Sequence, residues 1–277
     1  MADAPLDKPD AATGLGAPLV GRSVVVTRTR AQAASLADPL EALGAEVLAF
    51  PVLDTVDPED WGPADAAIAD LASYDWIVLT STNGVERFLR RLKAVGGSRE
   101  ALLGSKFAAV GSATAEKLRR HGLPPHLVPQ DFRAEGLVSA LHELGAGPGW
   151  RVLVPRALEA REVLPEALRD LGVIVDVVPV YRTVRVPADE GVLARLRAGS
   201  VDCVSFTSGA IATAFVASLE DGGVDPVEAL ARAAIASIGP VTSDALESLG
   251  YVRDLEAPEA TMESLAAAIG RFTGWKR

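Results

Sequence analysis

Short apolar runs alternate with longer segments of helical spacing along most of the chain. Residues 23–27 form a β-branched run, residues 32–43 carry apolar side chains three and four positions apart, and Gly44 precedes a second apolar run at 46–50. Apolar strands that alternate with helices predict parallel sheets with helices on both faces, so we expect an α/β protein. Further strands are predicted at 75–80, 107–110, 151–154, 173–178, 202–206, 234–238 and 252–255.

This pattern occurs twice in the chain. The segment that starts at Val24, VVVTRTRAQAASLADPLEALGAEVLAFPVLDTV, is similar to VLVPRALEAREVLPEALRDLGVIVDVVPVYRTV, which starts at Val152, and Arg28 aligns with Arg156 at an offset of 128 positions. Two further pairs follow in the same order at offsets of 127 and 128: LTSTNGVERFL with FTSGAIATAFV, and AVGSATAEKLRRHG with SIGPVTSDALESLG. The period indicates a duplicated domain, because solenoid units span about 20 to 50 residues.

Two segments interrupt the alternation of strands and helices. LAFPVLDTVDP and VVPVYRTVRVP continue as extended chain after their strands, with prolines where a helix would begin. They lie at equivalent points of the two copies, so we expect the chain to cross between domains twice. The predicted organisation is a mobile tail at 1–20, a discontinuous first domain of 21–52 plus 186–277, a second domain at 57–180, and connectors at 51–58 and 179–187.

Composition and charge exclude several classes of protein. The chain has 277 residues, of which 49% are hydrophobic, and its net charge of −10 disfavours a general nucleic-acid or anionic-membrane surface. The longest uncharged stretch near mid-chain, 203–219, is interrupted by serines, threonines and a glycine, so no membrane span is predicted. A single cysteine, Cys203, and an N-terminus without the pattern of a signal peptide predict a cytoplasmic protein.

Six elements in a fixed order give the chain a more specific resemblance. They are VTR after the first strand, TSTNGV at 80–85, AVGSAT at 109–114, VPR with REVL at 154–164, the connector VYRTV, and SIGPVT at 237–242. Over about residues 21–270 this set resembles the uroporphyrinogen-III synthase family. The resemblance implies two similar parallel-sheet, flavodoxin-like α/β domains, joined by a two-stranded connector and with a ligand cleft between them.

The resemblance also implies a cofactor-free cyclisation. A linear hydroxymethylbilane loses its hydroxyl as water, a spirocyclic intermediate forms and rearranges, and ring D closes inverted to give uroporphyrinogen III. Because unassisted closure occurs without inversion, the protein must control geometry through positioning and electrostatics. We therefore expect no metal, no cofactor, no nucleic-acid partner and no membrane contact, with hydroxymethylbilane as the small-molecule substrate of a monomer.

Hydroxyl-bearing residues follow several predicted strands, at the edge where parallel α/β sheets bind their ligands. Each of these turns opens a helix, so backbone N–H groups and hydroxyls there can receive the carboxylates of a polycarboxylate substrate. The alternative is that these residues serve only as helix N-caps. The candidate substrate-binding residues of this type are Thr80, Ser81, Ser112, Thr114, Thr207, Ser208 and Thr242.

Three arginines complete the candidate substrate-binding set. Arg28 and Arg156 occupy duplicate positions at strand ends, and Arg161 follows shortly afterwards. A guanidinium group binds a carboxylate bidentately, whereas the alternative, a surface or interdomain ion pair, contributes little. Substrate binding by Arg156 or Arg161 predicts that replacement by alanine weakens binding with little effect on thermal stability.

Tyr181, in the VYRTV connector, is the catalytic candidate to which the resemblance points. A phenol there can hydrogen-bond the departing hydroxyl and then shield a developing cation. The alternative is an amphipathic aromatic that packs against one face of the connector. The first copy has Leu53 at the equivalent position, so the duplication is asymmetric at this point.

Two other classes of protein share this pattern. A non-catalytic bilobal α/β module that binds an anionic metabolite would have the same architecture. A nucleotide-dependent transferase would need a phosphate loop, which the sequence lacks. His121, His126 and His142 have no metal-ligand spacing, and Cys203 is interpreted as a small buried hydrophobe.

Overall fold

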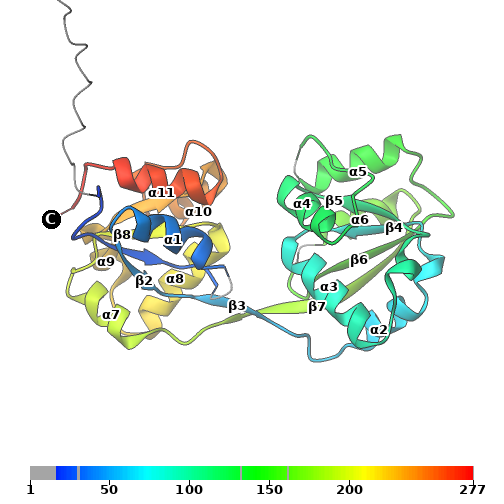
Figure 1. The fold of residues 1–277 in the computed structure, drawn as a ribbon, viewed down its shortest axis with the longest axis horizontal. Coiled ribbons are helices and arrows are strands. Elements are labelled where there is room, and N and C mark those ends of the chain that lie inside the picture. Colours follow the sequence, from blue (N-terminus) through cyan, green and yellow to red (C-terminus); the bar gives the residue numbers. More distant parts are fainter. Residues whose placement is uncertain (1–16, 30–31, 132, 161, 277) are drawn as a thin grey trace, which may run out of the picture. The chain divides into compact units, whose positions relative to one another are not determined.

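The computed structural model describes residues 17–29, 32–131, 133–160 and 162–276. The chain divides into two compact units, unit 1 (Met1–Asp54 and Arg185–Arg277) and unit 2 (Thr55–Val184). Each unit contains one five-stranded sheet with helices around it (Figure 1). The expected α/β class with two predominantly parallel sheets is therefore confirmed.

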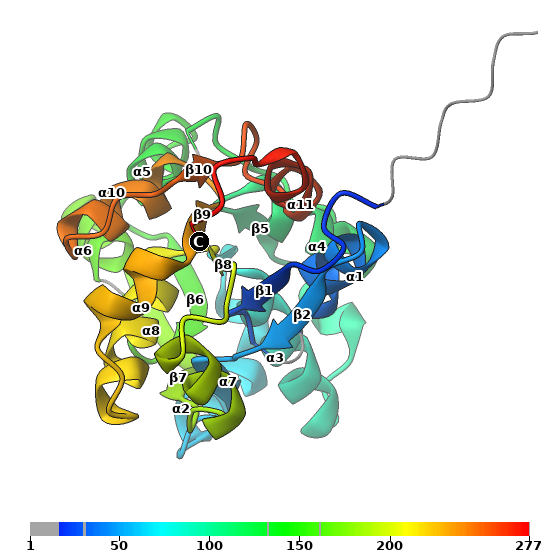
Figure 2. The ribbon, with the colours of Figure 1, turned by 90° about the vertical axis from the view of Figure 1, so that its left-hand side faces the viewer.

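The sheet of unit 1 has the strand order β10-β9-β8-β1-β2, which can be followed in Figure 2, and its neighbouring strands are parallel. Strand β1 comes from the N-terminal part of the chain, and its partner β8 comes from the C-terminal part, with Val24 opposite Cys203. Both parts are therefore needed to form this sheet. The strands are β1 (Ser23–Val26), β2 (Glu46–Ala49), β8 (Cys203–Phe206), β9 (Ala234–Ser237) and β10 (Leu255–Glu256).

Alternate residues of β1 face opposite sides of this sheet, as the pleat requires. Val24 and Val26 belong to a buried cluster with residues of α1 (Ala34–Ala42) and α11 (Met262–Arg271). Val25 belongs to a second cluster on the other face. The helices that contribute to this second cluster are α7 (Glu190–Arg197), α8 (Gly209–Asp221), α9 (Pro226–Arg232) and α10 (Pro240–Ser248).

The sheet of unit 2 has the strand order β3-β7-β6-β4-β5. The strands from β7 to β5 pair in parallel, so their carboxyl ends share one edge of the sheet. Strand β7 has 12 residues and reaches the unit boundary at Arg185, whereas β3 crosses the other boundary, after Asp54. The strands are β3 (Leu53–Val56), β4 (Trp76–Leu79), β5 (Lys106–Ala109), β6 (Arg151–Ala157) and β7 (Ile174–Arg185).

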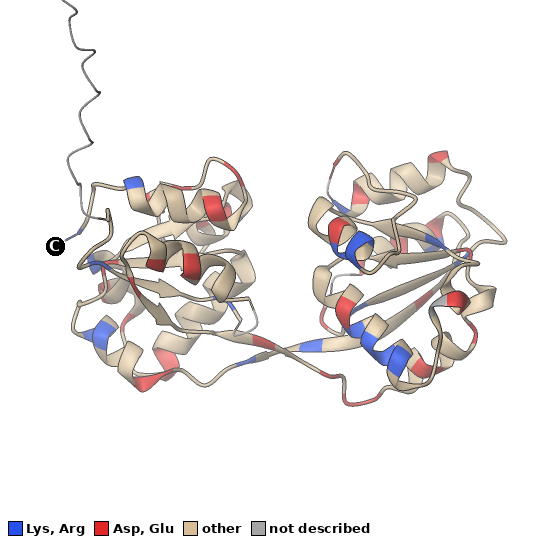
Figure 3. Cartoon of the chain, viewed as in Figure 1, with Lys and Arg blue, Asp and Glu red and all other residues tan. Residues whose placement is uncertain are grey.

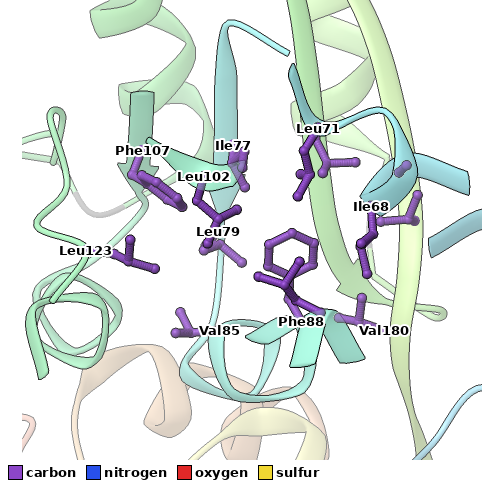
Figure 4. Packing of buried hydrophobic residues seen from close by; sticks show 14 of the residues in the cluster. Ile68, Leu71, Ile77, Leu79, Val85, Phe88, Leu102, Phe107, Leu123 and Val180 are labelled. Atoms are coloured by element: carbon purple, nitrogen blue, oxygen red, sulfur yellow. The ribbon is translucent and has the colours of Figure 1, made fainter. Parts of the chain in front are cut away.

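Helices cover both faces of this second sheet. One face packs against α2 (Gly62–Ala69), α3 (Thr82–Ala94) and α4 (Ser112–Arg120), with 3₁₀ turns at Leu71–Ser73 and Arg99–Leu102. The other face packs against α5 (Ala134–Glu143) and α6 (Val163–Asp170). Phe88 lies fully buried within the first of these layers (Figure 4). Its replacement by alanine would destabilise the fold by about 3–5 kcal/mol.

The duplication is visible in the backbone. Gly44 and Gly172, which are equivalent positions, adopt positive φ angles of 89° and 83° after α1 and α6. Glycine is favoured at these helix ends because other residues rarely adopt that conformation. At Gly44 an added Cβ would also lie 2.8 Å from Val20 Cγ2.

Two predicted elements differ from the structure. Helix α1 begins at Ala34, two residues later than the apolar spacing predicts. The last strand is Leu255–Glu256 and not 252–255, because Val252 is 70% exposed and the chain enters the sheet only at Leu255. Within the part of the chain that the structure describes, no helix has both the length and the apolar character needed to cross a bilayer.

Candidate functional site

The carboxyl edge of the unit 2 sheet carries the first group of candidate residues. Thr80 and Ser81 follow β4 directly, and Ser81 is the N-cap of α3. The Ser81 Oγ accepts a hydrogen bond from the Gly84 N–H at 3.0 Å, as serine does at a helix start. Helix capping, the alternative to substrate binding considered from the sequence, is therefore observed for Ser81. The same hydroxyl also makes a further contact.

That further contact joins Ser81 to Tyr181. Their hydroxyl oxygens lie 3.0 Å apart, and either one can be the donor. The strand register places Tyr181 opposite Ala157, just after an irregularity between Arg156 and Ala157, and the Leu158 N–H donates to the Tyr181 carbonyl at 2.9 Å. Tyr181 is only 8% exposed and belongs to the buried cluster of unit 2 that contains Phe88, so the packing role considered from the sequence is observed together with the hydrogen bond to Ser81.

Gly84 allows the start of α3 to approach the end of β6. A Cβ at this position would lie 3.3 Å from the Pro155 carbonyl oxygen and 3.2 Å from Ser81 Oγ. A side chain there would press against the backbone of β6. The glycine of the TSTNGV element thus brings the capping serine close to the strand end that carries Arg156.

Arg156 is buried at the end of β6, with 5% of its surface exposed. It forms an ion pair with Glu162, whose side chain is half exposed. Burial lowers the pKa of the Arg156 guanidinium, with a further contribution from Arg169. The alternative considered from the sequence was a surface or interdomain ion pair, and the observed pair differs from both, because it lies within unit 2 and its guanidinium is buried. Glu162 was not among the predicted residues, although the REVL element contains it.

The other candidates of unit 2 are less closely connected to Tyr181. Ser112 is the first residue of α4 and is exposed, whereas Thr114, two residues further, is 5% exposed. The N-cap of this helix is Gly111, which offers no side chain, so the N–H groups of the first turn carry no side-chain cap bond. Arg161 lies outside the described residues.

In unit 1, Arg28 is anchored at the carboxyl end of β1. Its Nη1 lies 2.8 Å from Met262 Sδ on α11, and its Nε donates to the Gln32 carbonyl at 3.2 Å. Desolvation lowers the pKa of the Arg28 guanidinium. In the described part of this unit, Arg28 forms no ion pair with a carboxylate.

The remaining hydroxyls of unit 1 follow β8 and β9. Ser208 is the N-cap of α8 and accepts from the Ile211 N–H at 3.3 Å, and Thr207 before it is partly exposed. Thr242 in the first turn of α10 is 5% exposed.

Sequence reasoning missed a buried serine pair at the end of β9. The hydroxyls of Ser237 and Ser243 lie 3.0 Å apart, and Ser243 also donates to the Glu256 carboxylate. The signal was present, because the two serines stand at the ends of the SIGPVTS segment, which a strand and a helix start bring together.

The described residues contain no group of three or more His, Cys, Asp or Glu side chains that could hold a metal ion. Burial raises the pKa of the Cys203 thiol, which keeps it protonated. The strand ends therefore offer neutral hydroxyls, backbone N–H groups and arginines. This chemistry suits binding of an anion and transfer of a hydroxyl proton.

Two doubly wound parallel sheets, with hydroxyls and arginines at their carboxyl edges, define a two-domain α/β protein. The profile of a family described as uroporphyrinogen-III synthase HemD matches residues 34–267. The chain therefore belongs to the uroporphyrinogen-III synthase family.

Several known proteins are similar to this chain over most of its length. A uroporphyrinogen-III synthase from Synechococcus elongatus is 36% identical over 92% of this chain and 97% of its own. The crystal structure of a mutant uroporphyrinogen III synthase from Thermus thermophilus matches with a TM-score of 0.66 and 25% identity, covering 90% of this chain and 98% of that one. The enzyme from Helicobacter pylori, at 17% identity and a TM-score of 0.55 over 89% of this chain and 97% of its own, shares the fold.

Proposed function

We propose that this protein converts hydroxymethylbilane to uroporphyrinogen III, with loss of water and inversion of ring D. Family membership over residues 34–267 supports the reaction. We assign the reaction to particular residues on the basis of one contact. This contact is the 3.0 Å hydrogen bond between Ser81 and Tyr181 at the carboxyl edge of the unit 2 sheet.

Tyr181 serves as the group that assists departure of the substrate hydroxyl. The Ser81 Oγ already accepts from the Gly84 N–H, so its own proton can be donated to the Tyr181 oxygen. The phenol proton is then available to the leaving hydroxyl, which departs as water. The helix start of α3 orients this pair, because its N–H group fixes the serine.

The strand ends of each sheet offer groups that receive carboxylates of the substrate. Helix N-termini there present N–H donors, which bind anions without requiring a basic protein. Arg28 and Arg156 add positive charge from duplicate positions, and both are anchored by neighbours. The full proposed binding set is Arg28, Thr80, Ser81, Ser112, Thr114, Arg156, Arg161, Thr207, Ser208 and Thr242.

We also infer the organisation and setting of the enzyme. The domains are 21–52 plus 186–277 and 57–180, with connectors at 51–58 and 179–187. The division into two compact units near residues 54 and 185 supports this assignment. A cytoplasmic monomer without cofactor is proposed. The single, buried thiol of Cys203 supports the cytoplasmic setting, because it forms no intrachain disulfide.

The test is a coupled assay with freshly prepared hydroxymethylbilane. The product is oxidised and its isomers are separated by chromatography. We expect mainly the type III isomer from the protein and type I from buffer alone. A product mixture identical to the spontaneous one would refute the enzymatic assignment and would favour a module that only binds an anionic metabolite.

A further inference from the structure

A cavity lies in unit 2 between the C-terminal halves of α3 and α4, apart from the site described above. Its volume is about 720 Å³, within the range of roughly 300–1,000 Å³ typical of small-molecule sites. Leu89, Leu92 and Leu123 provide apolar lining. We call this cavity the α3–α4 groove. Its cationic lining residues are Arg90, Lys93, Arg119 and Arg120.

This groove lies away from the proposed reaction site. Helices α3 and α4 begin after the carboxyl ends of β4 and β5, so their last turns lie toward the amino ends of those strands. Ser81 and Tyr181 are at the carboxyl edge, whereas Lys93 and Arg120 are at the opposite ends of the helices. The groove is therefore a separate feature of the same unit.

The groove carries a local excess of positive charge on an acidic protein. Helices α3 and α4 together contain seven Lys and Arg but only two Glu, whereas the whole chain has a net charge of −10. Figure 3 shows this concentration of basic residues along α3. Such a patch attracts anions that the rest of the surface repels.

Two carboxylates near the groove are already shared between cations. Asp57 contacts both Arg87 and Arg90. Glu116 lies 3.7 Å from Arg119 and 3.2 Å from Arg120.

Glu86 is engaged in the same way. It lies 2.5 Å from Lys117 and 3.4 Å from His121, and the hydrogen bond from Lys117 lowers the pKa of this carboxyl. Lys93 has no ion-pair partner among the described residues. The cations are therefore only partly neutralised by the protein itself.

Basic residues in the last turn also complement the helix dipole, at about 0.3–1 kcal/mol each. The helix dipole accounts for basic residues at the end of each helix taken separately. It does not explain why cations from two helices line one cavity that also has three leucines. Gly97 contributes to this shape, because a Cβ there would lie 2.4 Å from Leu92 Cδ1 and the loop could not pack so closely.

We propose that the α3–α4 groove binds a polycarboxylate with an apolar body, of the cyclic tetrapyrrole class to which the proposed product belongs. Rings of the ligand pack on Leu89, Leu92 and Leu123, and its carboxylates pair with Arg90, Lys93, Arg119 and Arg120. Inorganic phosphate is a poorer fit, since it has no apolar part to cover the three leucines of the lining. The choice of ligand rests on the proposed function, whereas the groove itself does not.

The test is calorimetric titration of the full-length protein with uroporphyrin III, the stable oxidised form of the product. We expect two binding events for the unchanged protein. Arg120→Glu and Lys93→Glu should each weaken one event by about tenfold or more, by loss of one charge-assisted contact and addition of a repulsion. Isomer-specific turnover should stay unchanged in both variants.

Arg133→Glu is the matched control. The side chains of Arg133 and Arg120 are both 73% exposed and both pair with a carboxylate, but Arg133 does not line the groove. We expect its two binding events to match those of the unchanged protein. Equal isotherms for Arg120→Glu, Lys93→Glu and the unchanged protein would overturn the proposal.

Pyrophosphate is the second probe. Displacement of uroporphyrin from the groove by pyrophosphate at similar concentration would overturn the requirement for an apolar body. Failure of the proposed function is seen separately, as absence of type III product. Loss of one binding event in the groove variants would then still establish the groove as a site.

Discussion

Ser81 Oγ and Tyr181 Oη lie 3.0 Å apart although 100 positions separate the two residues in the chain. One belongs to a helix start and the other to a long strand, so the bond joins two elements of the unit 2 fold. A substitution at either residue therefore removes a hydrogen-bond partner of the other. Measuring turnover and stability for each variant separates the catalytic from the structural contribution of the bond.

Tyr181→Phe should slow turnover by about 10–100-fold, because it removes one positioned hydroxyl from the proposed reaction. The ring remains, so the melting temperature should change little. The measurement is kcat with hydroxymethylbilane, combined with thermal unfolding. Tyr251→Phe, at a partly buried tyrosine of unit 1, is the control and should retain full activity. Unchanged turnover in Tyr181→Phe would assign Tyr181 to packing alone.

Ser81→Ala should lower both stability and turnover. Loss of the N-cap reduces the free energy of unfolding by about 0.5–2 kcal/mol, and the Tyr181 hydroxyl loses its partner. Thr261→Ala removes a comparable cap, since Thr261 accepts from the Ser264 N–H at 3.1 Å. The control should lose similar stability in urea unfolding but keep its turnover. Equal kcat values in the two variants would contradict a role for Ser81 beyond capping.

Arg156→Ala should destabilise the protein, contrary to the expectation from the sequence. The side chain is 5% exposed and paired with Glu162, so its loss should reduce the free energy of unfolding by about 1.5–3 kcal/mol. Arg156→Lys should restore part of this stability. Its KM for hydroxymethylbilane should remain above that of the unchanged protein, because an ammonium does not reproduce a bidentate contact. Recovery of both values in Arg156→Lys would argue against substrate binding.

Stability should fall at alkaline pH because of Tyr74. Burial raises the pKa of this phenol above its ordinary value of 10.0, and the hydrogen bond to Asp176 at 2.8 Å raises it further. The folded state thus holds the proton more tightly than the unfolded state does. This contribution is complete below about pH 10 and is lost as the pH rises above it. Urea midpoints at pH 8 and pH 11 should differ less in Tyr74→Phe than in the unchanged protein.

Turnover should survive exhaustive chelation. The proposed reaction uses hydroxyls, N–H groups and arginines, and no cluster of metal ligands occurs in the described ranges. Activity is measured before and after treatment with EDTA and with phenanthroline. A loss that zinc or magnesium alone restores would contradict the proposal.

The local pattern of the sequence was sufficient for the fold class. The β-branched run of β1 and the helical spacing of α1 can both be recognised within a short window of sequence, although β1 is buried on both faces and therefore does not alternate. The predicted start of the last strand was wrong, since Val252 is apolar but exposed and the strand begins only at Leu255. Hydrophobicity alone does not indicate which apolar run enters a sheet.

Contacts between distant elements could not be predicted in the same way. The bond between Ser81 and Tyr181 depends on the register of β6 and β7, including the irregularity after Arg156. The basic residues that line the α3–α4 groove, such as Arg120, resemble ordinary exposed residues of helix ends. Their convergence on one cavity depends on how two helices pack, which no local window contains.

The position of β1 between β2 and β8 has a consequence for synthesis of the chain on the ribosome. Val24 pairs with Cys203, which is translated 179 positions later. At about 5–20 residues per second, roughly 10–40 s pass before this partner exists. All the residues of unit 2 are made in that interval, so unit 2 can fold first. During that time the edge of the apolar strand β1 that later pairs with β8 has no partner, and an unpaired strand edge of this kind is where another chain can add by mistake.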